Sequence, residues 1–189
     1  MQARGALAGG LPRGPQARYI TAMLTSTDTP LYIVKESPIH GRGVFARVDI
    51  PPGTRIIEYT GERITSDESA RRAEAGGGPI NHTFFFSLED GNLIDGGSGG
   101  NEARFINHAC EPNCEAYEED GRVFIYSLHH IEAGDELNYN YALIYEARHT
   151  PAVKRAFACY CGAPSCTGVM LAPKRRSRKP AKTAAHNAG

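Results

Sequence analysis

The cysteines constrain the fold of this chain more than any other feature of its sequence. Cys159, Cys161 and Cys166 form a Cys-x-Cys-x4-Cys run near the C-terminus, and the distant segment Asn107-His108-Ala109-Cys110 supplies a further thiol. Four thiolates form a closed structural zinc site that leaves no position for a substrate. We therefore predict that one zinc ion pins the C-terminal segment beside Asn107 and His108, as a lid next to the chemistry. The competing interpretation is that these cysteines are spare thiols.

The formal net charge of zero hides an uneven distribution. Of the 21 basic and 21 acidic side chains, residues 1–30 and 174–189 together hold nine basic and one acidic. Residues 31–173 therefore carry 12 basic and 20 acidic side chains, a net charge of −8. An acidic body attracts basic partners and disfavours direct nucleic-acid binding, which we would expect only through the basic tail.

Targeting signals are weak in this sequence. No run approaches the roughly 18 apolar residues of a membrane-spanning helix, so we expect no membrane partner. No apolar core of signal-peptide length lies between Arg4 and Arg13, and we expect an intracellular protein. A bacterial cytoplasm, a nucleus or chromosome, and a secreted effector are the alternatives that remain open. In a reducing compartment the five cysteines are metal ligands or free thiols rather than disulfides.

Composition divides the chain into a compact body and two tails. Residues 1–30 read as a flexible arm and residues 173–189 as a disordered basic tail. One helix is expected to begin after an N-cap at Thr65, with Glu68 three residues later, and to end at Gly76-Gly77-Gly78. Runs of β-type composition, separated by turn signals, predict six strands: Leu31–Lys35, Gly43–Ala46, Arg55–Tyr59, Thr83–Leu88, Arg122–Ser127 and Leu137–Tyr141. The body is therefore predicted to be mostly β.

Four segments, in order, resemble the SET-domain lysine methyltransferases, with the trithorax-like branch as the nearest form. They are Ser37-Pro-Ile-His-Gly-Arg-Gly-Val-Phe-Ala46 through Glu62, Gly100-Asn-Glu-Ala-Arg-Phe-Ile-Asn-His108, Glu136-Leu-Asn-Tyr-Asn-Tyr141, and Cys159 to Cys166. The resemblance implies a SET domain of short curled sheets with a short helical insert (residues 31–142). It also implies a zinc-bound post-SET lid (residues 143–172). The implied activity is transfer of a methyl group from S-adenosylmethionine to a protein lysine.

The family's catalytic residues carry over to three tyrosines. By motif position, Tyr141 is the principal catalytic tyrosine, with its hydroxyl beside the transferring methyl, and Tyr59 lines the lysine channel. Tyr139 occupies the family's phenylalanine/tyrosine product switch, and its hydroxyl favours monomethyl-lysine as the product. Taken alone, Tyr139 and Tyr141 alternate as in a strand and would read as core residues facing one side.

The same resemblance implies the residues that hold the cofactor and the metal. The structural zinc would be bound by Cys110, Cys159, Cys161 and Cys166, which leaves Cys114 as a free thiol. His129 and His130 fit no motif and are expected on the surface. S-adenosylmethionine would be bound by His40, Arg42, Gly43, Phe84, Arg104, Asn107, His108, Tyr141 and Tyr160.

The sequence departs from the family's pattern at four positions. Phe84 replaces a tyrosine of the cofactor site, and Ala109 replaces a serine or threonine. Asn138 and Asn140 replace the usual threonine and aspartate, although the amide of Asn140 can still form hydrogen bonds. Two alternatives therefore stay open: a weakly active SET module that binds the donor and a basic peptide, and a zinc-stapled interaction protein.

The acidic body predicts the class of substrate. We expect a lysine within a basic, histone-like protein segment, because a net charge of −8 attracts such a segment. Methylation of the chain's own tail, at Lys174, Lys179 or Lys182, is a second possibility.

Overall fold

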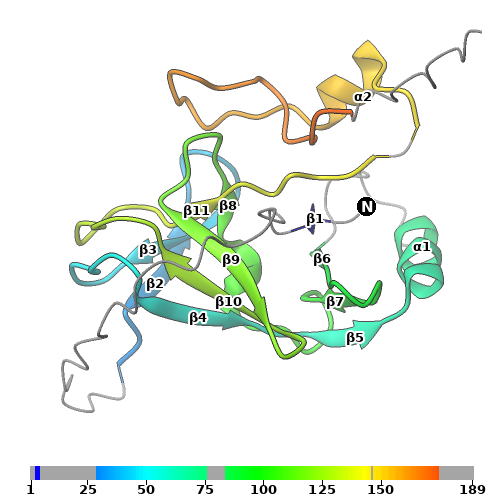
Figure 1. Cartoon of the computed structure of the whole chain (residues 1–189). Coiled ribbons are helices and arrows are strands. Elements are labelled where there is room, and N and C mark those ends of the chain that lie inside the picture. The colour runs from blue at the N-terminus through cyan, green and yellow to red at the C-terminus, as the bar shows by residue number, and fades with distance from the viewer. Residues whose placement is uncertain (1–2, 5–28, 76–83, 146, 175–189) are drawn as a thin grey trace, which may run out of the picture.

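The computed structural model describes residues 3–4, 29–75, 84–145 and 147–174 (Figure 1). Most of the predicted arm (residues 1–30) and tail (residues 173–189) lies outside the described residues, as do Thr83 and the glycines expected to end the helix. Among the described residues, no helix is long and apolar enough to cross a membrane.

Strands dominate the described part of the body and form four small sheets there, which confirms the mostly β prediction. The three-stranded sheet has the order β4 (Arg55–Tyr59), β10 (Arg122–Ser127), β9 (Cys114–Glu119). The four-stranded sheet has the order β1 (Ala3–Arg4), β6 (Phe85–Ser87), β7 (Leu93–Asp95), β5 (Glu62–Ile64). Two-stranded pairs are formed by β2 (Tyr32–Glu36) with β3 (Arg42–Ala46), and by β8 (Asn107–His108) with β11 (Asn138–Tyr139).

The main core lies where these sheets face one another. Val44, Ile50, Val123, Ile125 and Leu137 are 0% exposed there. Burying an aliphatic side chain of this size contributes about 1.5–3 kcal/mol. Tyr59 and Tyr139 belong to the same buried cluster, so two of the predicted site residues are fixed by the core itself.

Helices are few and short. The first, α1 (Ser66–Ala75), begins as predicted, because the hydroxyl of Thr65 accepts a 3.2 Å hydrogen bond from the backbone N–H of Glu68. A 3-10 helix, η1 (Glu102–Phe105), precedes β8. A second helix, α2 (Pro151–Ala156), was not predicted, although Thr150 caps it and Pro151 opens it.

Several strand predictions need correction. The strands β4 and β10 have the predicted bounds, whereas the run Leu137–Tyr141 pairs only at Asn138–Tyr139, so Tyr141 follows the strand rather than belonging to it. The prediction missed β1, which lies in the predicted flexible arm, and also β5, β7, β8 and β9. Those segments are either very short or, like β9, rich in glutamate, so their pairing depends on long-range partners rather than on local propensity.

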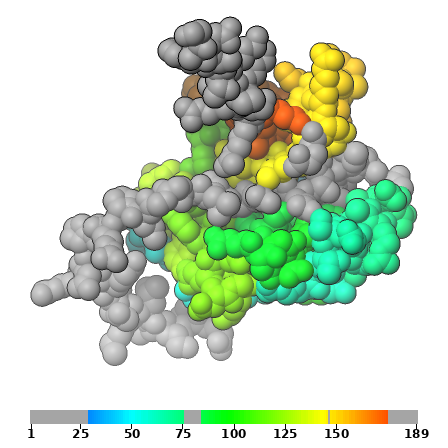
Figure 2. Space-filling view, turned by 45° about the vertical axis from the view of Figure 1, so that its right-hand side comes forward, coloured from blue at the N-terminus to red at the C-terminus, as the bar shows by residue number. Residues whose placement is uncertain are grey.

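The C-terminal part of the chain returns over the body. We use the name C-terminal lid for residues 143–145 and 147–172, drawn in yellow and orange above the body in Figures 1 and 2. The lid is closed on itself by the bridges Leu143–Leu171 and Ala158–Val169. Phe157, at the end of α2, is 1% exposed and packs against Tyr145 with 6.0 Å between ring centroids. These contacts hold the segments of the lid together.

Candidate active site

A cavity of about 410 Å³ lies between the body and the C-terminal lid. Nearly all predicted site residues line it. All three predicted catalytic tyrosines do so, together with eight of the nine predicted cofactor residues: His40, Arg42, Phe84, Arg104, Asn107, His108, Tyr141 and Tyr160. These residues come from six separate parts of the sequence and meet around one space.

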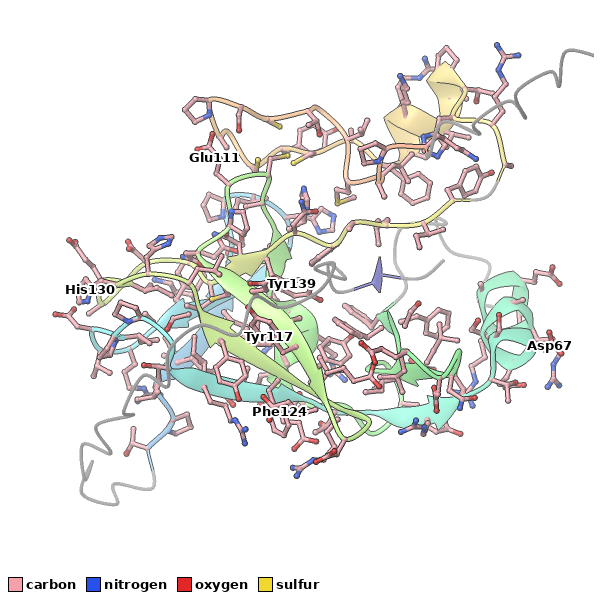
Figure 3. The ribbon with its side chains drawn as sticks, viewed as in Figure 1. Asp67, Glu111, Tyr117, Phe124, His130 and Tyr139 are labelled. Carbon is pink, nitrogen blue, oxygen red and sulfur yellow. The ribbon has the colours of Figure 1, made fainter. Side chains whose placement is uncertain are left out.

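The short parallel pair of β8 and β11 brings two of the motifs together. Asn107 lies opposite Asn138, and His108 lies opposite Tyr139. Figure 3 shows Tyr139 within the body, beside these strands. Because parallel strands run side by side in the same direction, Tyr141 emerges next to His108. Their ring centroids are 5.4 Å apart.

Hydrogen bonds hold both the side-chain hydroxyl and the backbone N–H of Tyr141. Its hydroxyl donates a 2.6 Å hydrogen bond to the carbonyl of Ile106, and its backbone N–H donates to His108 Nδ1 at 3.1 Å. Burial, followed by the proximity of Tyr139 and Glu136, raises the pKa of Tyr141 well above its ordinary value. Its hydroxyl is therefore protonated at neutral pH.

Tyr139 stands beside Tyr141, with 4.9 Å between the ring centroids. Its residue is 5% exposed, and burial raises the pKa of its hydroxyl. That hydroxyl has no hydrogen-bond partner among the described residues. In the described structure, every fully buried side-chain nitrogen or oxygen atom does have such a partner. The Tyr139 hydroxyl therefore reaches open space rather than being sealed in the core.

Tyr59 completes the aromatic wall. Its hydroxyl donates a 2.7 Å hydrogen bond to the backbone carbonyl of Phe84. Its ring packs against the Phe86 ring, with 5.5 Å between the ring centroids. Burial, together with nearby Tyr139 and Tyr141, raises the pKa of Tyr59 well above its ordinary value. The three tyrosines therefore keep neutral hydroxyls and line the cavity with aromatic side chains.

Two arginines stack on one phenylalanine at another part of the wall. The guanidinium of Arg42 lies 4.2 Å from the centroid of the Phe105 ring, and that of Arg104 lies 4.7 Å from it. Arg104 also donates to the carbonyl of Gly96 at 3.0 Å. Phe84 packs edge-on against Phe105, with 6.1 Å between centroids. Phe105 thus orients both cations, a role the sequence did not reveal.

Gly43, the ninth predicted cofactor residue, does not line the cavity. Gly41 lines it instead, at φ +51°, a backbone conformation that favours glycine. A Cβ on Gly43 would lie 2.3 Å from Glu136 Oε1. Glu136 in turn accepts hydrogen bonds from Asn107 Nδ2 at 2.7 Å and from Ser37 at 2.9 Å. Gly43 therefore makes room for the carboxylate that orients Asn107.

His108 connects the cavity to the cysteines. It is 5% exposed, and burial lowers its pKa to about 4, so the imidazole is neutral. Its Nδ1 faces the backbone N–H of Tyr141, and its Nε2 lies 3.6 Å from Cys110 Sγ.

The four predicted ligands do form a cluster. The sulfur atoms of Cys110, Cys159, Cys161 and Cys166 all lie within 4.8 Å of one another, so this set could hold one metal ion. Four thiols at this spacing fit a tetrahedral zinc site. Cys114 lies apart from them, 1% exposed, and burial raises its pKa to about 12. His129 and His130 are exposed, as predicted.

A contact from the segment between β8 and β9 supports the cluster. Glu111, labelled in Figure 3 where the body meets the lid, accepts a 3.0 Å hydrogen bond from the backbone N–H of Ser165. The backbone N–H of Cys110 points to Cys161 Sγ at 3.5 Å. The cluster therefore joins body and lid through backbone as well as side-chain contacts.

The lid contributes residues that sequence reasoning missed. Arg155, Ala156, Phe157 and Met170 line the cavity from above. The helix-start signal Thr150-Pro151 could have revealed α2, but nothing local indicated which face of it meets the body. Tyr160, as predicted, lies on the same side and is 72% exposed.

The charge of the cavity wall is one-sided. Arg42, Arg104 and Arg155 line it, and no carboxylate does among the described residues. Of these three guanidinium groups, that of Arg155 has no hydrogen bond, ion pair or ring contact to the described part of the chain. The cavity thus combines an aromatic end with cationic groups suited to an anionic group of a ligand.

Comparison with known proteins gives one consistent result. The family model described as SET domain matches residues 41–142. A histone-lysine N-methyltransferase of Candida albicans, described as H3 lysine-4 specific, is 36% identical over 155 residues, which cover 78% of this chain and 14% of that protein. Histone-lysine N-methyltransferase trithorax of Drosophila melanogaster is 36% identical over 137 residues, covering 70% of this chain and 4% of the relative.

A solved structure agrees with these matches. Polycomb repressive complex 2 of Chaetomium thermophilum, in an autoinhibited conformation bound to S-adenosylmethionine, superposes with a TM-score of 0.57 at 31% identity. The superposition covers 69% of this chain and 17% of the other. In each comparison the chain spans less than a fifth of the length of the protein it matches.

Proposed function

The chain belongs to the SET-domain family, and on that premise we propose that it transfers methyl groups from S-adenosylmethionine to protein lysines. The observation that carries the proposal is the position of Tyr141. Its hydroxyl is fixed against the carbonyl of Ile106 on the wall of a cavity that Asn107 and His108 also line. The motifs and the cavity thus agree on one place for the chemistry.

The donor would occupy the cavity between body and lid. Its size, about 410 Å³, lies within the range of sites that bind small molecules and cofactors. The arginines would meet the donor's carboxylate, and Asn107 and His108 would contact it from β8. Tyr160 would cover it from the lid. The relative bound to S-adenosylmethionine supports this class of ligand.

The reaction is an in-line displacement. The lysine nitrogen forms a bond to the donor's methyl carbon as the carbon–sulfur bond breaks, which leaves S-adenosylhomocysteine and a methylammonium. Catalysis of this kind depends on holding the two reactants in line. The Tyr141 hydroxyl, beside the Ile106 carbonyl, would orient the methyl group through weak C–H···O contacts.

The amine must arrive without its proton. No carboxylate lines the cavity among the described residues, and both nitrogens of His108 have partners. The aromatic wall disfavours the ammonium by desolvation, while its ring faces tolerate the sulfonium and the methylated product. The channel would therefore select the neutral amine that solvent delivers.

We propose monomethyl-lysine as the product. The Tyr139 hydroxyl, which has no partner in the described structure, is free to hold a water beside the acceptor nitrogen. That water would fill the space that a second methyl group needs.

We propose that the four-cysteine cluster holds one structural zinc. Four sulfurs within 4.8 Å of one another support this, and they leave no open position for substrate. All five cysteines are free thiols, in keeping with our proposal of an intracellular protein.

The substrate we propose is a lysine in a basic, histone-like segment. The net charge of −8 over residues 31–173 favours it, and the first relative named above is described as specific for a lysine of histone H3. The chain's own lysines, such as Lys174, are the second candidate.

The test is methyl transfer from labelled S-adenosylmethionine, with the protein alone and with histones and basic peptides. The Tyr141→Phe variant runs in parallel. Label on an added protein, lost in the variant, supports the proposal, and label on the chain alone assigns the substrate to its own lysines. If donor binds but no label transfers to any protein, the chain is a binding module and the enzymatic proposal is wrong.

A further inference from the structure

Tyr141 is anchored by a single short segment, residues 106–110. Its hydroxyl donates to the Ile106 carbonyl at 2.6 Å, and its backbone N–H donates to His108 Nδ1 at 3.1 Å. The same segment ends at Cys110, one of the four clustered cysteines. One run of five residues therefore binds Tyr141 through hydrogen bonds and also supplies one cysteine of the cluster.

The hydrogen bonds determine the tautomer of His108. A backbone N–H can only donate, so Nδ1 must offer its lone pair to Tyr141. The proton of the neutral ring is then on Nε2, which lies 3.6 Å from Cys110 Sγ. The ring therefore donates an N–H···S hydrogen bond to that sulfur. A metal-bound thiolate accepts such a bond better than a neutral thiol does, because it carries negative charge.

We propose that His108 is a positioning residue that couples the four-cysteine site to Tyr141. The inference rests on the proposed function and deepens it: metal binding at the lid orients the imidazole, and the imidazole holds the backbone of Tyr141. His108 then acts on the chemistry through Tyr141, in addition to its place on the cavity wall. The structural site and the reacting groups are linked by two hydrogen bonds rather than by proximity alone.

Two substitutions separate the halves of this link. In His108→Asn the shorter amide can occupy the place of Nδ1 and keep the Tyr141 contact, but it cannot reach Cys110. In His108→Gln the longer amide can occupy the place of Nε2 and keep a donor toward Cys110, but it loses the acceptor for Tyr141. His129→Asn is the matched control, because His129 is exposed and lies outside the cavity.

The first readout is the absorption spectrum of the cobalt-substituted protein, which reports on the thiolates without any turnover. We expect the sulfur-to-cobalt band to shift in His108→Asn and to stay near wild type in His108→Gln and His129→Asn. The second readout is turnover of the zinc protein at saturating donor. We expect kcat to fall about tenfold in both His108 variants, which corresponds to one lost hydrogen bond of about 1.4 kcal/mol.

A third measurement uses the unmodified chain and does not depend on whether the variants fold. In protein labelled with ¹⁵N-tyrosine, the amide resonance of Tyr141 should shift when a chelator removes the metal. That of Tyr126, on the outer face of β10, should not. An unchanged Tyr141 amide on chelation, or an unshifted cobalt band in a folded His108→Asn, overturns the coupling. Failure of the proposed function would be seen separately, as no methyl transfer by the wild type while the cobalt and amide readouts still respond.

Discussion

The hydroxyl of Tyr141 donates a 2.6 Å hydrogen bond to the backbone carbonyl of Ile106. Ile106 is 1% exposed and belongs to the main core, so the acceptor cannot move without disturbing the body. A core carbonyl thus fixes a hydroxyl at the wall of the cavity. The most direct prediction concerns this contact.

Replacing Tyr141 with phenylalanine should lower kcat at least about tenfold, because the variant loses a positioned hydrogen-bonding group. The Kd for S-adenosylmethionine, measured by calorimetry, should stay within about twofold, since one lost contact that forms mainly at the reacting centre affects turnover more than binding. Tyr117→Phe is the control, because Tyr117 is 46% exposed and its hydroxyl contacts Glu115. Wild-type turnover in Tyr141→Phe would remove the residue from its proposed role.

Tyr139→Phe should shift the product from monomethyl-lysine toward dimethyl- and trimethyl-lysine. The Tyr139 hydroxyl has no partner in the described structure, so its removal frees space and releases any water it holds. Mass spectrometry of a methylated peptide at long reaction times gives the distribution. Tyr126→Phe, on a residue that does not line the cavity, should leave the distribution unchanged. A monomethyl product from both variants would contradict the assignment of the switch.

Chelation should open the C-terminal lid, because the folding energy of a structural zinc site depends on its metal. We expect faster proteolysis within residues 147–174, and donor affinity at least about tenfold weaker, equivalent to about 1.4 kcal/mol. Cys161→Ser should reproduce this effect and lower the zinc content measured by mass spectrometry. Cys114→Ala should keep the zinc, since Cys114 lies outside the cluster. Full donor affinity in chelated protein would show that the lid closes without metal.

Arg155→Ala should weaken donor binding about tenfold, as expected for loss of a hydrogen bond from a charged group to a carboxylate. The guanidinium of Arg155 lines the cavity without a partner in the described chain, whereas its neighbour Lys154, exposed on the same helix, does not line it. Lys154→Ala removes the same charge from α2 and should leave the Kd unchanged. Equal effects of the two substitutions would indicate only a general field of positive charge.

Activity should rise with pH between pH 7 and 9, by up to about tenfold per unit, because free lysine has a pKa of about 10.4 and the neutral amine is the reacting form. Burial raises the pKa of Tyr59 and Tyr141 well above their ordinary value. Their hydroxyls therefore stay protonated throughout this range and cause no loss at its upper end. The check is kcat/KM at constant ionic strength. A fall in kcat/KM below pH 9, in protein that remains folded, would show that a cavity group must keep a proton that it loses there.

The sequence alone was enough to predict that the three tyrosines and the Asn107-His108 pair would lie together and that four cysteines would cluster. The spacing of Cys159, Cys161 and Cys166 and the Asn107-His108 pair are local patterns, and each constrains its own segment whatever the rest of the chain does. The cysteine cluster formed as predicted, and Tyr59, Tyr139 and Tyr141 all reached the cavity. Motif residues are predictable because their side-chain chemistry limits what they can do.

Tertiary structure alone decided how these residues meet. The parallel pairing of β8 with β11 spans residues 107 to 139, and two-residue strands carry no propensity signal strong enough to predict it. The same applies to Gly43, which makes room for Glu136 and does not line the cavity, and to Arg155, which a helix of the lid carries to the cavity wall. Such roles depend on contacts between segments far apart in the chain, and those contacts form only when the body and the lid have packed together.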